Sequence, residues 1–189
     1  STSTAPEVDF VTAPRQPGST LKPFLYAQAI AEKRLTAASL IDDSAAAIPT
    51  QSGLYVPKDY DRQFRGWVSV RQALAASLNV PAVRAIGIVG VNRFAEQLRR
   101  LGIQLTHTGD YYGYSLALGS AEMNLLQLTN AYRTLANAGR YSAVRMQATD
   151  PVSDPIKNGK QALDERANFI ISHILSDNNT RLTTFGNNS

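Results

Sequence analysis

A proline at position 23 lies inside a stretch with helical periodicity and restricts where that helix can begin. The stretch covers residues 19–35, where apolar residues recur at helical spacing. Proline has no backbone N–H, so a helix tolerates it only in the first turn, where that N–H would have no partner. The helix is therefore predicted to begin near Ser19, directly after the break at Pro17-Gly18.

A serine and a lysine are three residues apart at this predicted helix start. Ser19 would lie at the positive end of the helix, which stabilises an oxyanion or a polarised carbonyl. Lys22 would lie on the same face, and a partly desolvated lysine can take the proton of a serine hydroxyl. An ordinary surface helix, with Ser19 as N-cap and Lys22 exposed, fits the same spacing. The spacing alone does not separate these interpretations.

The composition indicates a globular protein and excludes several kinds of chemistry. The 189 residues are 43% apolar and 18% charged, enough for one domain with a sizeable core. Without cysteine there is no disulfide or thiol catalysis, and the two histidines are too far apart in sequence to suggest a zinc site. The net charge of +4 comes without a long basic run, so no nucleic-acid partner is expected. No phosphate-binding glycine motif occurs, and no cofactor is expected.

Most of the chain is predicted to be helical, which gives an α+β class with few strands. Strand patterns occur at residues 8–14 and 140–148, residues 42–66 suggest a long turn-rich excursion, and residues 111–120 suggest a strand or loop. Further helices are predicted at residues 69–79, 81–89, 91–102, 121–139 and 163–178.

Enzymes with a Ser-x-x-Lys pair also carry a downstream Ser-x-Asn, whose hydroxyl relays protons and whose amide holds the substrate. Two triplets in the chain have this pattern. Ser176-Asp177-Asn178 has the usual spelling and lies at the end of the last predicted helix. Ser77-Leu78-Asn79 is a looser match, at a helix end close to Pro81. Neither triplet identifies a site by itself.

Three longer stretches carry a resemblance to a known family. Residues 15–29 (RQPGSTLKPFLYAQA), 55–84 (YVPKDYDRQFRGWVSVRQALAASLNVPAVR) and 116–139 (LALGSAEMNLLQLTNAYRTLANAG) resemble the transpeptidase domain of class A penicillin-binding proteins, above all the penicillin-binding protein 1C branch. The resemblance extends from about residue 8 to residue 186. Within it the family's Ser-x-Asn falls on Ser77 and Asn79, so no catalytic part is expected for the triplet at 176–178.

This resemblance implies a fold and a reaction. The fold would be the helix-rich part of the serine β-lactamase/D,D-transpeptidase fold, an antiparallel sheet flanked by helices. Ser19 would attack the penultimate D-Ala carbonyl of a peptidoglycan stem peptide ending in D-Ala-D-Ala, and Lys22 would take its proton. Ser77 would relay a proton to the leaving amine, and Asn79 would bind the substrate amide. A second stem peptide would then form the cross-link, and β-lactam antibiotics would acylate the same serine.

The family's third motif, Lys-Thr/Ser-Gly, has no good match in the chain. Lys157-Asn158-Gly159 precedes the last predicted helix, whereas the family's motif follows it, so a surface turn is expected there. Residues 1–189 are therefore interpreted as a partial transpeptidase domain, without the glycosyltransferase module and the C-terminal sheet strands. A second chain or segment carrying Lys-Thr-Gly is expected as partner. The location would be periplasmic, with the parent protein anchored in the cytoplasmic membrane.

Two other functions stay open. A serine β-lactamase would share the Ser-x-x-Lys chemistry but hydrolyse its acyl-enzyme. A non-catalytic penicillin-binding or scaffolding module would explain the lack of a third motif. The partial domain alone is expected to be weak or inactive, and its helix faces at Leu21/Leu25 and Ile170/Ile174 are expected to need the missing strands as cover.

Overall fold

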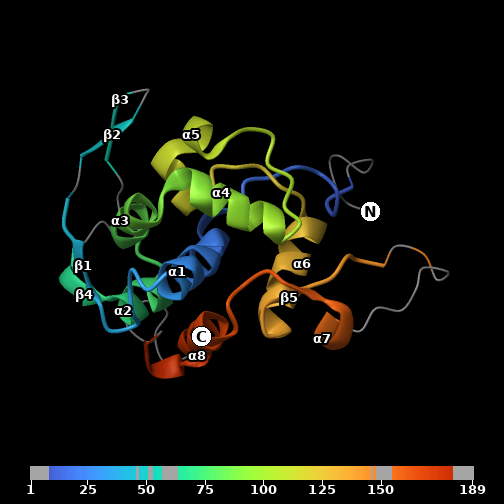
Figure 1. Cartoon of the computed structure of the whole chain (residues 1–189). Helices are drawn as coiled ribbons and strands as arrows, with labels where there is room; N and C mark the ends of the chain where they lie inside the picture. Colours follow the sequence, from blue (N-terminus) through green and yellow to red (C-terminus); the bar gives the residue numbers. More distant parts are fainter. Residues whose placement is uncertain are drawn as a thin grey trace, which may run out of the picture.

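The computed structural model of the protein describes residues 9–45, 47–50, 53–56, 64–145, 147 and 155–180. Helices make up most of these residues (Figure 1). The α-helices are α1 (Lys22–Ala31), α2 (Val70–Ala75), α3 (Asn79–Val89), α4 (Val91–Arg100), α5 (Gly109–Tyr112), α6 (Leu125–Ala136), α7 (Pro155–Asn158) and α8 (Glu165–Ser176). The 3-10 helices are η1 (Gly18–Leu21) and η2 (Gly113–Leu118). The strands are β1 (Leu40–Asp43), β2 (Ile48–Thr50), β3 (Gly53–Tyr55), β4 (Gly66–Ser69), β5 (Arg140–Tyr141) and β6 (Lys160–Gln161).

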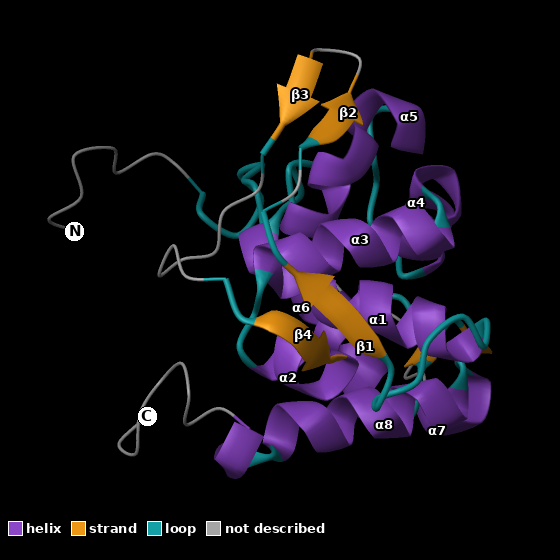
Figure 2. Ribbon diagram, turned by 90° about the vertical axis from the view of Figure 1, so that its left-hand side faces the viewer, coloured by secondary structure: helices purple, strands orange, loops and turns teal. Residues whose placement is uncertain are grey.

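The strands form small antiparallel sheets, β1 with β4 and β2 with β3 (Figure 2). A third pair joins β5 and β6. Ile41 and Val68 lie opposite each other in β1 and β4, and both are buried, which attaches this sheet to the helices. The predicted excursion over residues 42–66 was wrong in part, because it contains β2, β3 and the ends of β1 and β4. Residues 57–63 of that excursion lie outside the described part.

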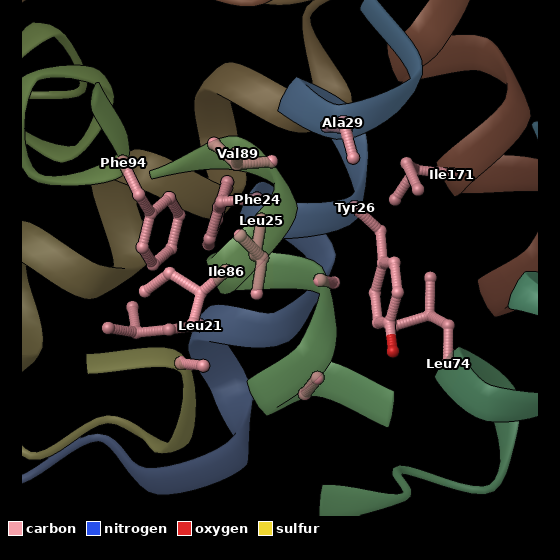
Figure 3. Packing of buried hydrophobic residues seen from close by; sticks show 14 of the residues in the cluster. Leu21, Phe24, Leu25, Tyr26, Ala29, Leu74, Ile86, Val89, Phe94 and Ile171 are labelled. Carbon is pink, nitrogen blue, oxygen red and sulfur yellow. The ribbon is translucent and has the colours of Figure 1, made fainter. Parts of the chain in front are cut away.

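Helix α1 passes through the core, and its residues 22–29 are all buried (Figure 3). Tyr26 lies toward Leu74 of α2 and Ile171 of α8, and Phe24 lies toward Phe94 of α4. The helix also packs against α3 and α8. Because α1 is enclosed in this way, the core fixes the position of the helix that follows the Ser19 turn.

Helices of this chain cover the apolar faces for which we expected missing strands. Leu21 and Leu25 are fully buried. Ile174 is also fully buried, and Ile170 is partly buried against the same core. The expectation was wrong because α1 and α8 pack on each other and α3 covers another side of α1.

The predicted strand over residues 8–14 is a turn in its described part, which begins at Asp9. The Asp9 carboxylate accepts hydrogen bonds from the backbone N–H of Val11 at 2.9 Å and the hydroxyl of Thr12 at 2.7 Å. These bonds lower the pKa of the Asp9 carboxyl. Such local side-chain bonds compete with strand pairing, and the alternating pattern does not reveal them.

Two other predictions of extended structure also differ from the fold. Residues 111–120 contain the second half of α5 and all of η2 instead of a strand or loop. Gly113 and Gly119, with φ of 58° and 75°, bound the 3-10 segment between them. Of residues 140–148, only Arg140–Tyr141 pairs as a strand, and residues 146 and 148 lie outside the described part.

The long helices follow the sequence closely. α6 begins with a capping box between Asn124 and Gln127, and α8 begins where the Asp164 carboxylate accepts from the N–H of Ala167. Gly102 and Gly139, both with positive φ, follow the ends of α4 and α6 as predicted. No helix in the described residues is both long and apolar enough to cross a bilayer.

Candidate active site

Ser19 and Lys22 are joined by one 3-10 turn at the start of the central helix. The N–H of Lys22 donates to the carbonyl of Ser19, and η1 continues directly into α1. Side chains three residues apart eclipse each other in a 3-10 turn, so those of Ser19 and Lys22 lie on the same side. Pro23 occupies the first turn of α1, which confirms the helix start predicted from it.

The two side chains differ sharply in exposure. Ser19 is exposed, whereas Lys22 is only 1% exposed. A buried lysine needs oxygen partners close by, because burying an unpaired ammonium is costly. The surface-helix interpretation, which expected an exposed Lys22, does not fit this arrangement.

The Lys22 amine reaches across to the corner between α2 and α3. Its Nζ lies 2.5 Å from the carbonyl oxygen of Ser77, 3.2 Å from the Ser77 hydroxyl and 2.7 Å from Oδ1 of Asn79. The amine therefore connects the Ser-x-x-Lys pair to the Ser77-Leu78-Asn79 triplet. A proton can pass between Lys22 and Ser77 over this contact.

Ser77 has a backbone conformation that glycine usually provides. Its φ is +55°, its N–H donates to the carbonyl of Leu74, and the N–H of Leu78 donates to that of Ala73. This is the Schellman arrangement that ends a helix, with serine where glycine is the common residue. The predicted single helix over residues 69–79 was therefore wrong at its end, because α2 stops at Ala75. The sequence gives no local sign of this turn.

A left-handed serine costs stability and is retained where the surroundings require it. We predict that Ser77→Gly is more stable than Ser77→Ala by about 0.5–1 kcal/mol, because glycine adopts φ +55° with less strain. Both variants lose the hydroxyl beside Lys22, so they differ only in the backbone. Urea unfolding of the two variants measures the difference. Equal stability would contradict the prediction.

Ser19, Lys22 and Ser77 line one pocket of about 370 Å³. Its other walls are largely apolar and come from α1, α2, α6 and α8, with Thr20 beside the nucleophile candidate. They are formed by Thr20, Pro23, Leu74, Ala75, Tyr132, Ile174 and Leu175. Exposed Ser19 and buried Lys22 thus both border one largely apolar space. The apolar walls carry no sequence motif and were not predicted.

A glycine outside the predicted motifs supports the Ser19 turn. A Cβ at Gly119 would overlap the backbone carbonyl and nitrogen of Gly18, which directly precedes Ser19. Close by, Arg15 and Met123 form a backbone bridge with N···O distances of 2.9 and 3.0 Å. The segment after η2 therefore packs backbone to backbone against the chain leading into the Ser19 turn.

The second Ser-x-Asn triplet is not part of the pocket lining, although it directly follows the lining residue Leu175. The Ser176 hydroxyl donates to the carbonyl of His173 at 3.1 Å, which closes the last turn of α8. Asp177 pairs with Arg71 of α2, with 3.3 Å between Oδ2 and Nη1. Lys157 lies in α7, which packs beside β5, and does not line the pocket. The expectation that neither motif is catalytic stays a prediction.

Comparisons with known proteins agree with the resemblance noted in the sequence. The family described as "Penicillin binding protein transpeptidase domain" matches residues 5–184. Penicillin-binding protein 1C of Escherichia coli (strain K12) is 36% identical over 171 residues, 90% of this chain and 21% of that protein. Penicillin-binding protein 1A of Neisseria meningitidis (serogroup A) is 32% identical over 183 residues, 88% of this chain and 22% of that protein. The chain thus spans about a fifth of the length of these curated relatives.

Solved structures show the same fold. The crystal structure of penicillin-binding protein 1A from Haemophilus influenzae matches with a TM-score of 0.75 and 25% identity, covering 90% of this chain and 31% of that chain. The transpeptidase domain of Burkholderia pseudomallei penicillin-binding protein 3 matches with a TM-score of 0.71 at 17% identity, covering 90% and 55%. The predicted helix-rich α+β fold is confirmed.

Proposed function

The chain belongs to the penicillin-binding protein transpeptidase domain family, and on that premise we propose that it forms the serine-bearing part of a peptidoglycan D,D-transpeptidase. Its substrates would be stem peptides ending in D-Ala-D-Ala, and β-lactams would acylate the same serine. The reaction takes place outside the cytoplasm, where peptidoglycan is cross-linked. The observation that most directly supports this proposal is the buried Lys22 amine, which contacts Ser77 and Asn79. Lys22 also lines the same pocket as Ser19.

The proposed reaction has two acyl transfers. Ser19 Oγ attacks the penultimate D-Ala carbonyl, and neutral Lys22 takes the hydroxyl proton. The C–N bond breaks, and Ser77, in contact with Lys22, passes a proton to the departing D-Ala amine. An amine of a second stem peptide then attacks the ester carbonyl, and the bond between that carbon and Ser19 Oγ breaks. The proton lost by the amine returns to Ser19 Oγ through Ser77 and Lys22. Asn79 orients the substrate amide and holds the Lys22 amine in place.

We further propose that this chain acts together with a Lys-Thr-Gly segment supplied by the same parent protein or by a second chain. No Lys-Thr/Ser-Gly occurs in the 189 residues, and the chain covers about a fifth of its curated relatives. Losing one preorganised oxyanion donor lowers the rate by about 10²–10³. Residues 1–189 alone should therefore label slowly with penicillin.

Labelling with a fluorescent penicillin tests the function, with Ser19→Ala as control. We expect labelling that Ser19→Ala abolishes and that persists after excess penicillin is removed. Release of the label within seconds would indicate a β-lactamase, and absence of labelling in a folded parent protein would indicate a non-catalytic module. Full, rapid labelling of residues 1–189 alone would refute the need for a Lys-Thr-Gly partner but would support Ser19 as nucleophile.

A further inference from the structure

One residue outside the predicted motifs makes a direct contact with the Ser19 turn. The hydroxyl of Tyr132, on α6, donates to the carbonyl oxygen of Thr20 at 2.8 Å. Tyr132 and Thr20 are 112 positions apart in sequence and line the same pocket as Ser19. The bond therefore ties the residue next to Ser19 to a separate helix.

The Tyr132 ring is itself held firmly. It meets the ring of Phe24 edge to face, with centroids 5.1 Å apart and an interplanar angle of 74°. Phe24 is fully buried in the centre of the core. Burial raises the pKa of the Tyr132 hydroxyl, so it keeps its proton and stays a donor through neutral and mildly alkaline pH.

The Ser19 turn needs such support because it is exposed. Ser19 and Thr20 are both exposed, and the threonine hydroxyl donates locally, to the carbonyl of Pro17 at 2.8 Å. Short 3-10 turns have poorer hydrogen-bond geometry than α-helices and open more easily. A donor fixed on α6 opposes rotation of the Thr20 peptide, and this rotation would move the neighbouring Ser19 relative to Lys22.

We infer that Tyr132 is a positioning residue that holds the Thr20 peptide and thereby aligns the Ser19 hydroxyl with Lys22 for acylation. The inference rests on the proposed function. The Tyr132 hydroxyl should therefore affect the rate constant of acylation and leave the affinity for penicillin unchanged. The aromatic ring forms part of the pocket wall, and the hydroxyl sets the geometry of the turn.

The test compares Tyr132→Phe with Tyr112→Phe. Both changes remove one phenol hydroxyl, but that of Tyr112 bonds Thr106 at 3.0 Å and lies outside the pocket lining. Tyr132→Phe retains the ring that packs on Phe24. The acylation rate constant at saturating penicillin, the Kd for penicillin and the Tm are measured in the parent protein. We expect Tyr132→Phe to lower the acylation rate constant about 10-fold with less than about a 2-fold change in Kd.

Two kinetic results would overturn the inference. In the first, Tyr132→Phe behaves like Tyr112→Phe. In the second, its rate constant, Kd and Tm all worsen together, which indicates a structural role alone. If the wild type does not acylate, the proposed function fails, and hydrogen exchange of residues 17–24 tests the positioning separately. Faster exchange there in Tyr132→Phe, absent in Tyr112→Phe, supports it, and unchanged exchange overturns it.

Discussion

Replacing Gly119 with alanine is expected to lower the rate of Ser19 acylation by at least about 10²-fold, although Gly119 belongs to neither catalytic motif. The added Cβ would overlap the backbone carbonyl and nitrogen of Gly18, and backbone atoms cannot move aside as a side chain can. The φ of +75° adds strain for alanine. We expect the free energy of unfolding to fall by about 2–4 kcal/mol.

Gly113→Ala is the matched control for this experiment. Gly113 lies in the same 3-10 helix region and also has positive φ, 58°, but a Cβ there meets no atom within 4 Å. With ψ of −149° its backbone lies in a region that is essentially restricted to glycine, so Gly113→Ala should lose about 1–3 kcal/mol of unfolding free energy and keep its acylation rate. Urea unfolding and time-resolved penicillin labelling measure both quantities. Equal acylation rates for the two variants would show that contact with Gly18 does not position Ser19.

Lys22→Met is expected to lower the acylation rate by about 10²–10⁴-fold, the usual contribution of a general base. Methionine has nearly the length and volume of lysine, so the fully enclosed site keeps its packing. What disappears is the amine that lies within 3.2 Å of the Ser77 hydroxyl and 2.7 Å of Asn79 Oδ1. The unfolding free energy should fall by about 1–3 kcal/mol, because buried oxygens lose a donor.

Lys33→Met provides the comparison. Lys33 is exposed just after the end of α1. The same chemical change there should leave the labelling rate unchanged and the free energy of unfolding within about 0.5 kcal/mol of the wild type. Labelling rates at several pH values separate loss of the base from loss of the fold. A Lys22→Met protein that acylates at the rate of Lys33→Met would rule out Lys22 as the base.

Much of the helical fold could be predicted from local signals. Pro23 located the start of the central helix, and the glycines after α4 and α6 marked their ends. The strands were not predictable in the same way, since β1 and β4 are four residues long and depend on each other across a gap in sequence. Residues 8–14 alternate like a strand, but the Asp9 carboxylate accepts from the N–H of Val11 and stabilises a turn there.

The same distinction between local signals and contacts across the sequence applies to the candidate site. Ser19, Lys22, Ser77 and Asn79 could be proposed from spacing and resemblance, because each lies in a short pattern that chemistry requires. The supports could not be predicted, because their effects arise only when distant segments meet. These supports are the backbone contact of Gly119, the hydroxyl of Tyr132 and the left-handed turn at Ser77.

The most direct test of Ser19 as the acylated nucleophile is peptide mapping by mass spectrometry after reaction with penicillin. The wild-type parent protein should carry one penicilloyl adduct on the peptide that contains Ser19, and Ser19→Ala should carry none while unfolding at the same temperature. An adduct on Ser77 or Ser176 instead, or an unmodified Ser19 peptide in a folded protein that binds penicillin, would contradict the assignment.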